Sequence, residues 1–399
     1  MAVSIVAAGI LGPHVPMRSA PAPGSPRPSL AKMELPGVRE PNPIFGLPGL
    51  AQLSPAPFDL AYSVLPNGIL SRSVAAIGTR IFFIVDDNRI MSTVVGWSSQ
   101  PTVLADAPAC HSIDEIAAAG HEMAYVESWP IGLPFESSGC GSPSSMAWSI
   151  WLLDLQGGAP RLTSAGVASG QQAATRPDVH VAVGDTTYAY NRPGSSAGGG
   201  SVIEVRSLSD NSLSWSTGTG GSVAALMLGG SHVAVLESSP DPASAGPSLE
   251  LADPAHPILR TVSHPGSAAS ISRDGSYLAW DVPDEGPQTP GGVDVQVVGT
   301  GATTFVAAPS GATAPKPLQP VVSAAATGPI VAWRATADGG SVYPAFRTSA
   351  NAPATAIASA QTTAWVNLQG TMLLWIAAAV DGSLGVAYAI DLAGARTQP

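Results

Sequence analysis

Short apolar runs alternate with turns rich in glycine and proline along most of the chain, which predicts many short β-strands. The clearest example is residues 270–282, Ser-Ile-Ser-Arg-Asp-Gly-Ser-Tyr-Leu-Ala-Trp-Asp-Val. Asp274-Gly275 supplies the positive φ that a tight hairpin turn needs, so strands are expected at 268–272 and 277–282. The second of these strands contains a small residue followed by an aromatic one, Ala279-Trp280.

The same unit, a glycine followed by a short apolar run, recurs along the chain. Seven glycines take this position at intervals of 42 to 64 residues: Gly78, Gly120, Gly184, Gly230, Gly275, Gly328 and Gly370. A repeat in the forties with several short strands per unit is typical of a β-propeller. We therefore predict an all-β fold, a seven-bladed β-propeller of four-stranded antiparallel blades at residues 57–397. The four strands of each blade are named a to d in chain order.

The seventh repeat has three strand-like runs and is one strand short of a complete blade. An unassigned run, Phe58–Leu65, precedes the first repeat and is followed by the turn Pro66-Asn67-Gly68. If this run pairs with residues 385–392, no sheet edge is left exposed where the ring closes. We predict that this N-terminal strand completes the last blade.

Two stretches resemble the repeat of TolB-like and WD-repeat-like β-propellers. Residues 270–282 carry its Ser-x-Asp-Gly turn and Leu-Ala-aromatic run, and residues 149–164 carry its aliphatic-Asp strand, Gly-Gly turn and Arg-Leu-Thr. This resemblance implies the propeller fold rather than a particular activity. Similar repeats form the propeller half of some peptidases, whose catalytic nucleophile lies in a second domain.

Composition and charge exclude several classes of partner. Only 11% of the residues are charged, the formal net charge is −11, and Lys32 and Lys316 are the only lysines. Nucleic acids and anionic membrane surfaces both require a basic patch, so neither is expected as a partner. Beyond the first residues, no segment has the roughly 20 uninterrupted apolar residues of a transmembrane span. We expect a monomer that binds no cofactor.

The first 50 residues are interpreted as a leader and a linker. Residues 2–12 are apolar and have the length of the core of a secretion signal, although the usual basic start is missing. The sequence Ala20-Pro21-Ala22 resembles a cleavage site; a plain flexible start is the alternative. Residues 12–50 are rich in Pro, Ser and Gly, which predicts a disordered linker. We predict a secreted or cell-envelope protein.

Cys110 and Cys140 are the only cysteines. The predicted blades place Cys110 in the link between the first two blades and Cys140 in the b–c loop of the second. Both loop types emerge on the same face of a propeller, so we predict a disulfide; two unlinked thiols are the alternative. A zinc site normally needs four ligands, and only His111 and His121 lie near in sequence, so no metal site is expected.

Binding residues are expected where strand b ends, because four b–c loops are long and rich in Gly, Pro and Ser: residues 129–148, 191–201, 237–247 and 283–292. Polar residues just past strand b, where the chain turns onto the rim that carries these loops, are candidate ligand-binding groups: Glu127, Asn191, Arg192, Glu237, Asp281 and Arg334. Ordinary solvated charges at strand ends are the alternative. Trp129 and Trp148 also fall near a loop and are candidates for a binding surface. A second set of aromatic residues is expected to pack between blades: Tyr125, Tyr190, Trp280, Trp333 and Trp375.

These observations favour a noncatalytic ligand-binding, protein-binding or scaffold propeller outside the cytoplasm that binds through the b–c loop rim. A protein or a small polar or glycan ligand would suit such a rim. The alternative is a secreted lyase or hydrolase that acts on a polysaccharide or peptide in the propeller channel. A cluster of hydrogen-bonded His, acid and Arg side chains at the channel mouth would favour the enzyme, and an uncharged rim with aromatic residues would favour binding.

Overall fold

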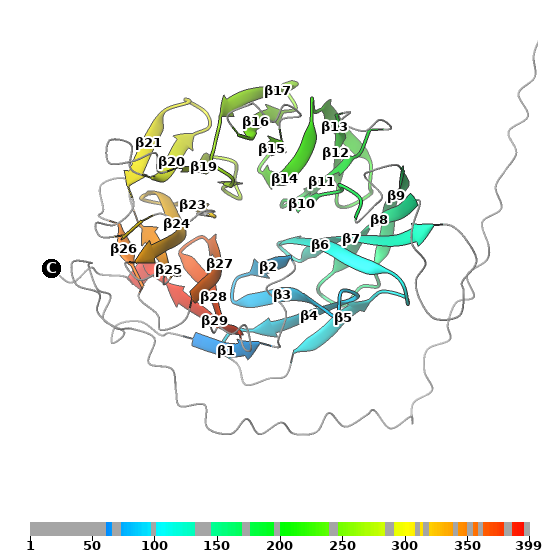
Figure 1. The fold of residues 1–399 in the computed structure, drawn as a ribbon, viewed down its shortest axis with the longest axis horizontal. Helices are drawn as coiled ribbons and strands as arrows, with labels where there is room; N and C mark the ends of the chain where they lie inside the picture. The colour runs from blue at the N-terminus through cyan, green and yellow to red at the C-terminus, as the bar shows by residue number, and fades with distance from the viewer. Residues whose placement is uncertain are drawn as a thin grey trace, which may run out of the picture. The chain divides into compact units, whose positions relative to one another are not determined.

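The computed structural model forms seven antiparallel sheets arranged in a ring, which confirms the predicted seven-bladed β-propeller (Figure 1). The chain divides into two compact units, Met1–Asn42 and Pro43–Pro399, and all described residues belong to the second. The structure describes residues 61–65, 73–96, 101–131, 145–169, 176–194, 200–238, 246–283, 291–307, 312–313, 319–337, 342–348, 354–357, 362–378 and 385–394. The predicted leader and linker at residues 1–50 lie outside these ranges.

The first four blades each contain four consecutive strands, as predicted. Blade 1 holds β2 (Val74–Ile77), β3 (Arg80–Val85), β4 (Arg89–Val94) and β5 (Thr102–Asp106). Blade 2 holds β6 (Ser112–Ala119), β7 (Glu122–Ile131), β8 (Ser145–Asp154) and β9 (Arg161–Ser169). Blade 3 holds β10 (Val181–Val183), β11 (Thr187–Arg192), β12 (Val202–Ser207) and β13 (Leu213–Gly218). Blade 4 holds β14 (Ser222–Gly229), β15 (His232–Ser238), β16 (Ser248–Asp253) and β17 (His256–Ser263).

The last three blades follow the same plan with one addition. Blade 5 holds β18 (Ala269–Ile271), β19 (Tyr277–Val282), β20 (Gly292–Val297) and β21 (Thr303–Ala307). Blade 6 holds β23 (Val321–Ala325), β24 (Gly328–Ala337), β25 (Val342–Arg347) and β26 (Thr355–Ala356), and the short β22 (Ala312–Thr313) also pairs with β24. Blade 7 holds β27 (Thr362–Gln369), β28 (Met372–Ala378) and β29 (Gly385–Asp391), followed by the 3-10 helix η3 (Leu392–Gly394).

The strand β1 (Ala61–Leu65) pairs antiparallel with β29, with Ala61 opposite Ala389 and Leu65 opposite Gly385. The sheet order is β1-β29-β28-β27, so blade 7 has one strand from the beginning of the described chain and three from its end. Residues 58–60 of the predicted closing strand lie outside the described residues. That this strand is needed to close the ring stays a prediction.

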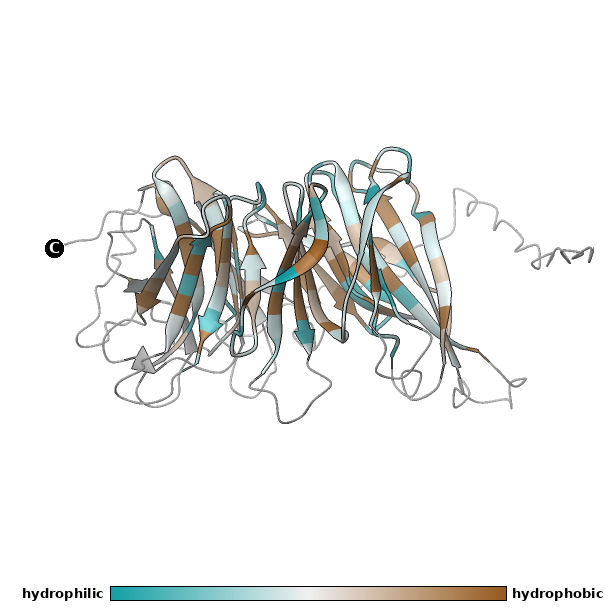
Figure 2. Ribbon diagram, turned by 90° about the horizontal axis from the view of Figure 1, so that it is seen from above, coloured by the Kyte–Doolittle hydropathy of each residue, from teal (hydrophilic) through white to brown (hydrophobic). Residues whose placement is uncertain are grey.

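The hydrophobic core consists of seven clusters, one between each pair of neighbouring blades. In β3, Ile81 and Phe83 pack against blade 7, whereas Phe82 and Ile84 pack against blade 2. Successive side chains of a strand point to opposite faces, so a strand with both faces covered needs an unbroken apolar run. Figure 2 shows these apolar residues concentrated along the strands. The expected inter-blade aromatics are all buried: Tyr125, Tyr190, Trp280, Trp333 and Trp375.

Blade 2 is longer than the sequence analysis expected. Strands β7 and β8 stay paired as far as Ile131 and Ser145, so residues 129–131 and 145–148 of the predicted b–c loop are strand. Pro130 is compatible with this position because β6 begins at Ser112, opposite Ser128, and leaves that edge of β7 without a ladder partner. The other three predicted b–c loops lie partly outside the described residues. Within the described residues, no helix is long and apolar enough to cross a membrane.

Candidate functional site

The six polar residues predicted at the ends of strand b lie on five different blades. Among the described residues, no hydrogen bond or ion pair joins one of the six to another, so the structure does not gather them into one shared site. Most of them instead bind the chain segment that leads into strand a of the same blade. Their role in ligand binding stays a prediction.

Three of these side chains accept hydrogen bonds from backbone N–H groups of that segment. Asn191 Oδ1 accepts from the N–H of His180 at 2.5 Å. Asp281 Oδ1 accepts from the N–H of Ser267 at 2.9 Å and from the next N–H at 2.8 Å. Glu237 Oε2 accepts from the N–H of Gly220 at 3.3 Å. These bonds satisfy backbone N–H donors at the point where the chain enters the blade. Without these bonds the donors would lack a partner.

The two arginines of the set differ in their surroundings. Arg334 Nε donates to the carbonyl of Thr363 on the next blade at 3.0 Å, and burial lowers the pKa of its guanidinium. Arg192 forms an ion pair with Glu204 of its own blade at 3.4 Å, and its side chain is 56% exposed. Arg334 therefore links two blades, whereas Arg192 faces solvent.

The two tryptophans proposed for the binding surface lie in different environments. Trp148 is 2% exposed and packs in the core between blades 2 and 3. A Cβ built on Gly166 would lie 2.5 Å from its indole ring, so the glycine makes room for it. Trp148 is thus a core residue and not part of the rim. Trp129 is only partly buried and stays on the rim.

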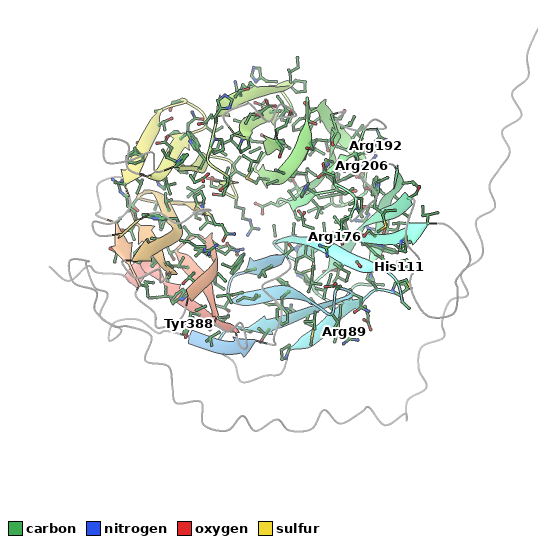
Figure 3. The ribbon with its side chains drawn as sticks, in the orientation of Figure 1. Arg89, His111, Arg176, Arg192, Arg206 and Tyr388 are labelled. Atoms are coloured by element: carbon green, nitrogen blue, oxygen red, sulfur yellow. The ribbon has the colours of Figure 1, made fainter. Side chains whose placement is uncertain are left out.

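Charged and aromatic side chains gather in two groups, one on the rim of blade 2 and one at its contact with blade 3. We call this set the blade 2–3 cluster, and it comprises His111, Asp114, Glu115, Glu127, Trp129, Arg176, Asp178 and His180. Figure 3 labels His111 and Arg176 beside β6 and β7. The sequence analysis named only Glu127 and Trp129 as site residues.

The outer part of the cluster is an aromatic pair held by a carboxylate. His111 Nδ1 lies 2.5 Å from Oε1 of Glu127, which is buried. The ring of His111 stacks on Trp129 with centroids 4.6 Å apart and an interplanar angle of 10°. His111 follows the turn that contains Cys110, whose φ is +67°. Cys140 lies outside the described residues, so the disulfide stays a prediction.

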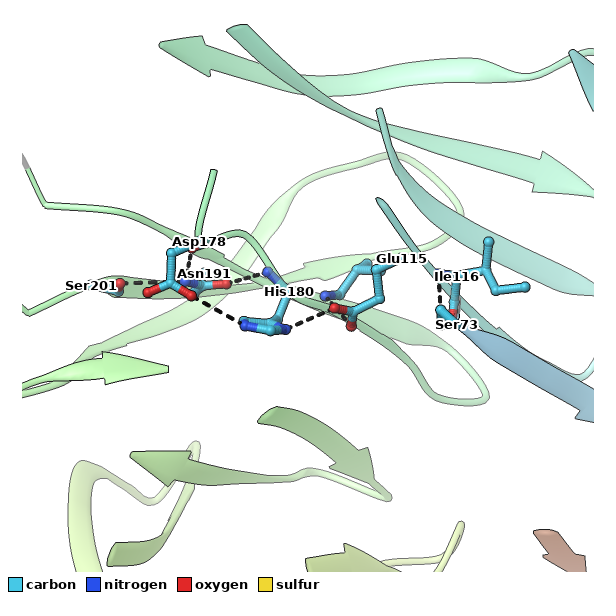
Figure 4. Close-up of polar contacts among 8 residues, drawn as sticks. Ser73, Glu115, Ile116, Asp178, His180, Asn191 and Ser201 are labelled. Atoms are coloured by element: carbon cyan, nitrogen blue, oxygen red, sulfur yellow. Dashed lines mark hydrogen bonds and ion pairs between the residues drawn. The ribbon is translucent and has the colours of Figure 1, made fainter. Parts of the chain in front are cut away.

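The inner part of the cluster links the first strands of two blades (Figure 4). His180 Nδ1 lies 2.7 Å from Oε2 of Glu115, and its Nε2 lies 3.2 Å from Oδ1 of Asp178. The other oxygen of Glu115 accepts from the N–H of Val181 at 3.2 Å. Burial acts to lower the pKa of His180, but the bonds to Asp178 and Glu115 outweigh it and raise that pKa to about 10. His180 is therefore an imidazolium at neutral pH.

A further ion pair, between Arg176 and Asp114, completes the cluster. Arg176 Nε lies 3.4 Å from Oδ1 of Asp114, with side chains 42% and 7% exposed. Asp114 lies at a bulge, where β6 shifts register against β7 between Ile113 and Glu115. The cluster then holds four carboxylates against two fixed cations, Arg176 and His180. Among the described residues, no group of three or more His, Cys, Asp or Glu side chains is placed to hold a metal ion.

No protein-family model matches the chain, and no curated protein is a significant match. The β-propeller domain of the trilobed protease from Pyrococcus furiosus is similar in structure, with a TM-score of 0.52 and 7% identity over 82% of this chain and 93% of that one. YCF48 bound to D1 peptide gives a TM-score of 0.51 and 9% identity over 87% and 98%. TolB from Acinetobacter baumannii gives only 0.37 and 11% over 70% and 80%, too low to support an argument. At these identities the likeness shows the fold alone, and the chain is a β-propeller similar to these domains in architecture.

Proposed function

We propose that this protein is a noncatalytic binding propeller that acts outside the cytoplasm and takes a peptide segment with a cationic side chain at the blade 2–3 cluster. The observation that carries the proposal is the aromatic stack of Trp129 and His111 on a blade that also carries the carboxylates Asp114, Glu115 and Glu127. These carboxylates suit a basic ligand. The cluster's His, acid and Arg side chains also match what was expected of the enzyme alternative, which is the second candidate below.

Trp129 supplies the face on which a guanidinium or ammonium group would rest. Cations are attracted to the faces of aromatic rings, most strongly to that of tryptophan. The ring of Trp129 is already positioned by His111, which is itself held by Glu127. A preorganised aromatic face loses little side-chain entropy when a ligand binds.

The charge of the site and of the chain favours the same class of partner. The cluster has four carboxylates and two fixed cations, and the chain as a whole carries −11. Such a surface steers cationic segments toward it and repels acidic ones. YCF48, a propeller of the same fold, binds a D1 peptide, so peptide binding is compatible with this architecture. A location outside the cytoplasm is supported by the predicted pairing of Cys110 with Cys140.

The test is fluorescence anisotropy with labelled seven-residue peptides of Gly and Ser. Two positions of each peptide carry the same test residue, which is Arg, Lys, Ser or Glu. We expect the Arg and Lys peptides to bind more tightly than the Ser peptide and the Glu peptide not to bind. Trp129→Ala should weaken binding of the Arg peptide roughly 2- to 30-fold, because it removes the aromatic face. Glu127→Gln should weaken it as well, since His111 loses its anchoring charge.

Glu122→Gln is the matched control, because Glu122 is a glutamate of the same strand, β7, at the end opposite Glu127. It should leave peptide affinity unchanged. Equal affinity for the Arg and Glu peptides would contradict the proposal, and so would full affinity in Trp129→Ala. Preferential binding of a neutral oligosaccharide such as maltohexaose at the same residues would replace the peptide by a glycan.

A secreted hydrolase is the second candidate, and the His111–Glu127 pair favours it. A carboxylate that holds one nitrogen of a histidine leaves the other nitrogen positioned as a general base. The sequence carries a Gly-x-Ser-x-Gly pentapeptide at residues 194–198, in the predicted b–c loop of blade 3, and residues 195–199 lie outside the described ranges. Hydrolysis of p-nitrophenyl acetate that is lost in both His111→Ala and Ser196→Ala would establish the enzyme. Activity equal to that of heat-unfolded protein would exclude an esterase of this kind.

A further inference from the structure

Arg334 is a partly buried arginine that has no carboxylate partner among the described residues. Its guanidinium makes two hydrogen bonds, both to neutral oxygens: Nε donates to the carbonyl of Thr363 at 3.0 Å, and Nη1 donates to Oε1 of Gln319 at 3.3 Å. Burial lowers the pKa of this guanidinium, and no carboxylate of the described residues acts to raise it. At Arg206, by contrast, Glu204 outweighs the effect of burial and raises the pKa.

The surroundings of Arg334 are almost free of acidic side chains. Among the described residues of blades 6 and 7, Asp391 is the only carboxylate. It lies opposite Met372, whereas Thr363 lies opposite Ala377. These two positions are five residues apart on β28, or roughly 17 Å, so Asp391 does not reach the guanidinium. A guanidinium stays charged at any physiological pH, and a charge that is partly buried without a partner is costly.

A second unsatisfied group faces the same space between blades 6 and 7, which are neighbours in the ring (Figure 1). The hydroxyl of Thr363 is fully buried and has no hydrogen-bond partner among the described residues. Thr363 faces the same side as Ala377, which is directly opposite it and packs between the two blades. Arg334 faces that space as well, because Ala332, two residues before it on β24, packs in the same cluster.

We propose that Arg334 and Thr363 form a binding site for a carboxylate group. A guanidinium has five N–H donors, and the two bonds of Arg334 leave three of them on Nη1 and Nη2. These two nitrogens can donate in parallel to both oxygens of a planar carboxylate, and the hydroxyl of Thr363 is available as a further donor.

The charge of the site favours a carboxylate over a phosphate. One carboxylate neutralises the single charge of Arg334, whereas a phosphate group carries about −1.5 to −2 at neutral pH and would leave an excess of negative charge. The site lies on blades 6 and 7, away from the blade 2–3 cluster, so the inference does not depend on the proposed function.

The test is isothermal titration calorimetry of the full chain, in a buffer without other carboxylates, with acetate, acetamide, methylammonium and phosphate. Acetate should bind at least about 10-fold more tightly than acetamide, which has the same shape and no charge. Phosphate should bind more weakly than acetate, and methylammonium should not bind. Equal affinity for acetate and acetamide, or tighter binding of phosphate, would overturn the proposal. N-acetylglycine, added as a fifth probe, distinguishes the sources of the carboxylate: tighter binding than acetate would indicate a peptide carboxyl terminus, and weaker binding a small free acid.

Two substitutions separate ligand binding from a structural role. Arg334→Gln should weaken acetate binding at least about 10-fold, since it removes a charged donor. Thr363→Val keeps the shape of the side chain and removes the hydroxyl. It should weaken acetate binding about 3- to 10-fold without lowering the melting temperature in the absence of acetate, because the hydroxyl makes no hydrogen bond within the described protein.

Arg192→Gln is the matched control, because Arg192 lies at the end of strand b in blade 3 and already has a carboxylate partner, Glu204, at 3.4 Å. It should leave acetate affinity unchanged. Wild-type affinity for acetate in both Arg334→Gln and Thr363→Val would overturn the proposal.

A carboxylate of the chain itself is the competing occupant of this site. Asp338 and Asp381 follow strand b of blades 6 and 7 in the sequence and lie outside the described ranges. If one of them filled the site, the wild-type protein would not bind acetate, and Asp338→Asn or Asp381→Asn would gain this binding. That result would overturn the proposal. Equal acetate affinity in the wild type and in both variants is the result that we expect.

Discussion

Replacing Glu115 by glutamine removes one of the two carboxylates that hold His180 between blades 2 and 3. In the wild-type protein, Glu115 and Asp178 raise the pKa of His180 from 6.5 to about 10. The glutamine side chain keeps an oxygen that can accept a hydrogen bond, but it carries no charge. We therefore expect the pKa of His180 to fall toward its ordinary value.

The raised pKa makes the stability of the wild-type protein depend on pH. A group whose pKa is higher in the folded state stabilises that state fully below its unfolded pKa, here near 6.5, and this contribution is lost as the pH rises through about 10. One such group changes the free energy of unfolding by at most about 1.4 kcal/mol per pH unit. His180 and Glu115 are 22% and 25% exposed, so solvent reduces this effect. We expect a total loss of about 2 kcal/mol between pH 6.5 and 10, and roughly half of that in Glu115→Gln.

The assay is guanidinium unfolding followed by circular dichroism at half-unit steps from pH 6.5 to 9.5, together with an NMR titration of the histidine ring protons. Asp106→Asn is the control, because it breaks an exposed ion pair with Arg89 and should leave the pH dependence unchanged. The reasoning is refuted if the wild-type His180 titrates near pH 6.5. It is also refuted if Glu115→Gln keeps the wild-type dependence on pH.

Three further predictions concern the fold. Deleting residues 1–50 should leave the melting temperature unchanged, whereas deleting residues 1–66 should lower it sharply, because the second deletion removes the strand that pairs with β29. Equal melting temperatures of the two truncated proteins would contradict closure by this strand. Cys110 and Cys140 should form a disulfide under oxidising conditions, which mass spectrometry of a nonreduced digest would detect as linked peptides; full labelling of both thiols would show the pairing to be wrong. Trp280→Ala should lower the free energy of unfolding by about 3–5 kcal/mol through the cavity it leaves between blades 4 and 5, as measured by denaturant unfolding; a loss under about 1 kcal/mol would mean that this ring does not fill the core.

The fold could be predicted because each blade repeats local signals. The strand predicted at 277–282 is observed with the same bounds, and the turn before it works as expected. Asp274 accepts hydrogen bonds from the hydroxyl of Ser272 at 2.7 Å and from the N–H of Ser276 at 3.1 Å, and Gly275 has a φ of +76°. Turn chemistry and apolar runs act over a few residues, so they are visible in one sequence.

The blade 2–3 cluster could be predicted only in part, because some of its residues are distant in sequence and come together only when the blades pack. His180 and Glu115 are 65 residues apart, and their contact depends on how neighbouring blades pack. The sequence does carry one usable signal, since Glu115 and Asp178 each lie close to the start of a strand a in consecutive blades. The prediction that Trp148 lies at a loop is wrong, because β7 and β8 stay paired past Pro130. A proline fits there because β6 does not extend that far, and the sequence does not show this.

The most direct test of the proposed binding site is hydrogen–deuterium exchange of the protein with and without the Arg peptide. If the blade 2–3 cluster binds the peptide, amides in residues 110–116, 127–131 and 176–181 should exchange more slowly in its presence. The a–b turns, including residues 272–276, should exchange at the same rate with and without it. Protection confined to the a–b turns would contradict the account and place the peptide on the opposite face of the ring.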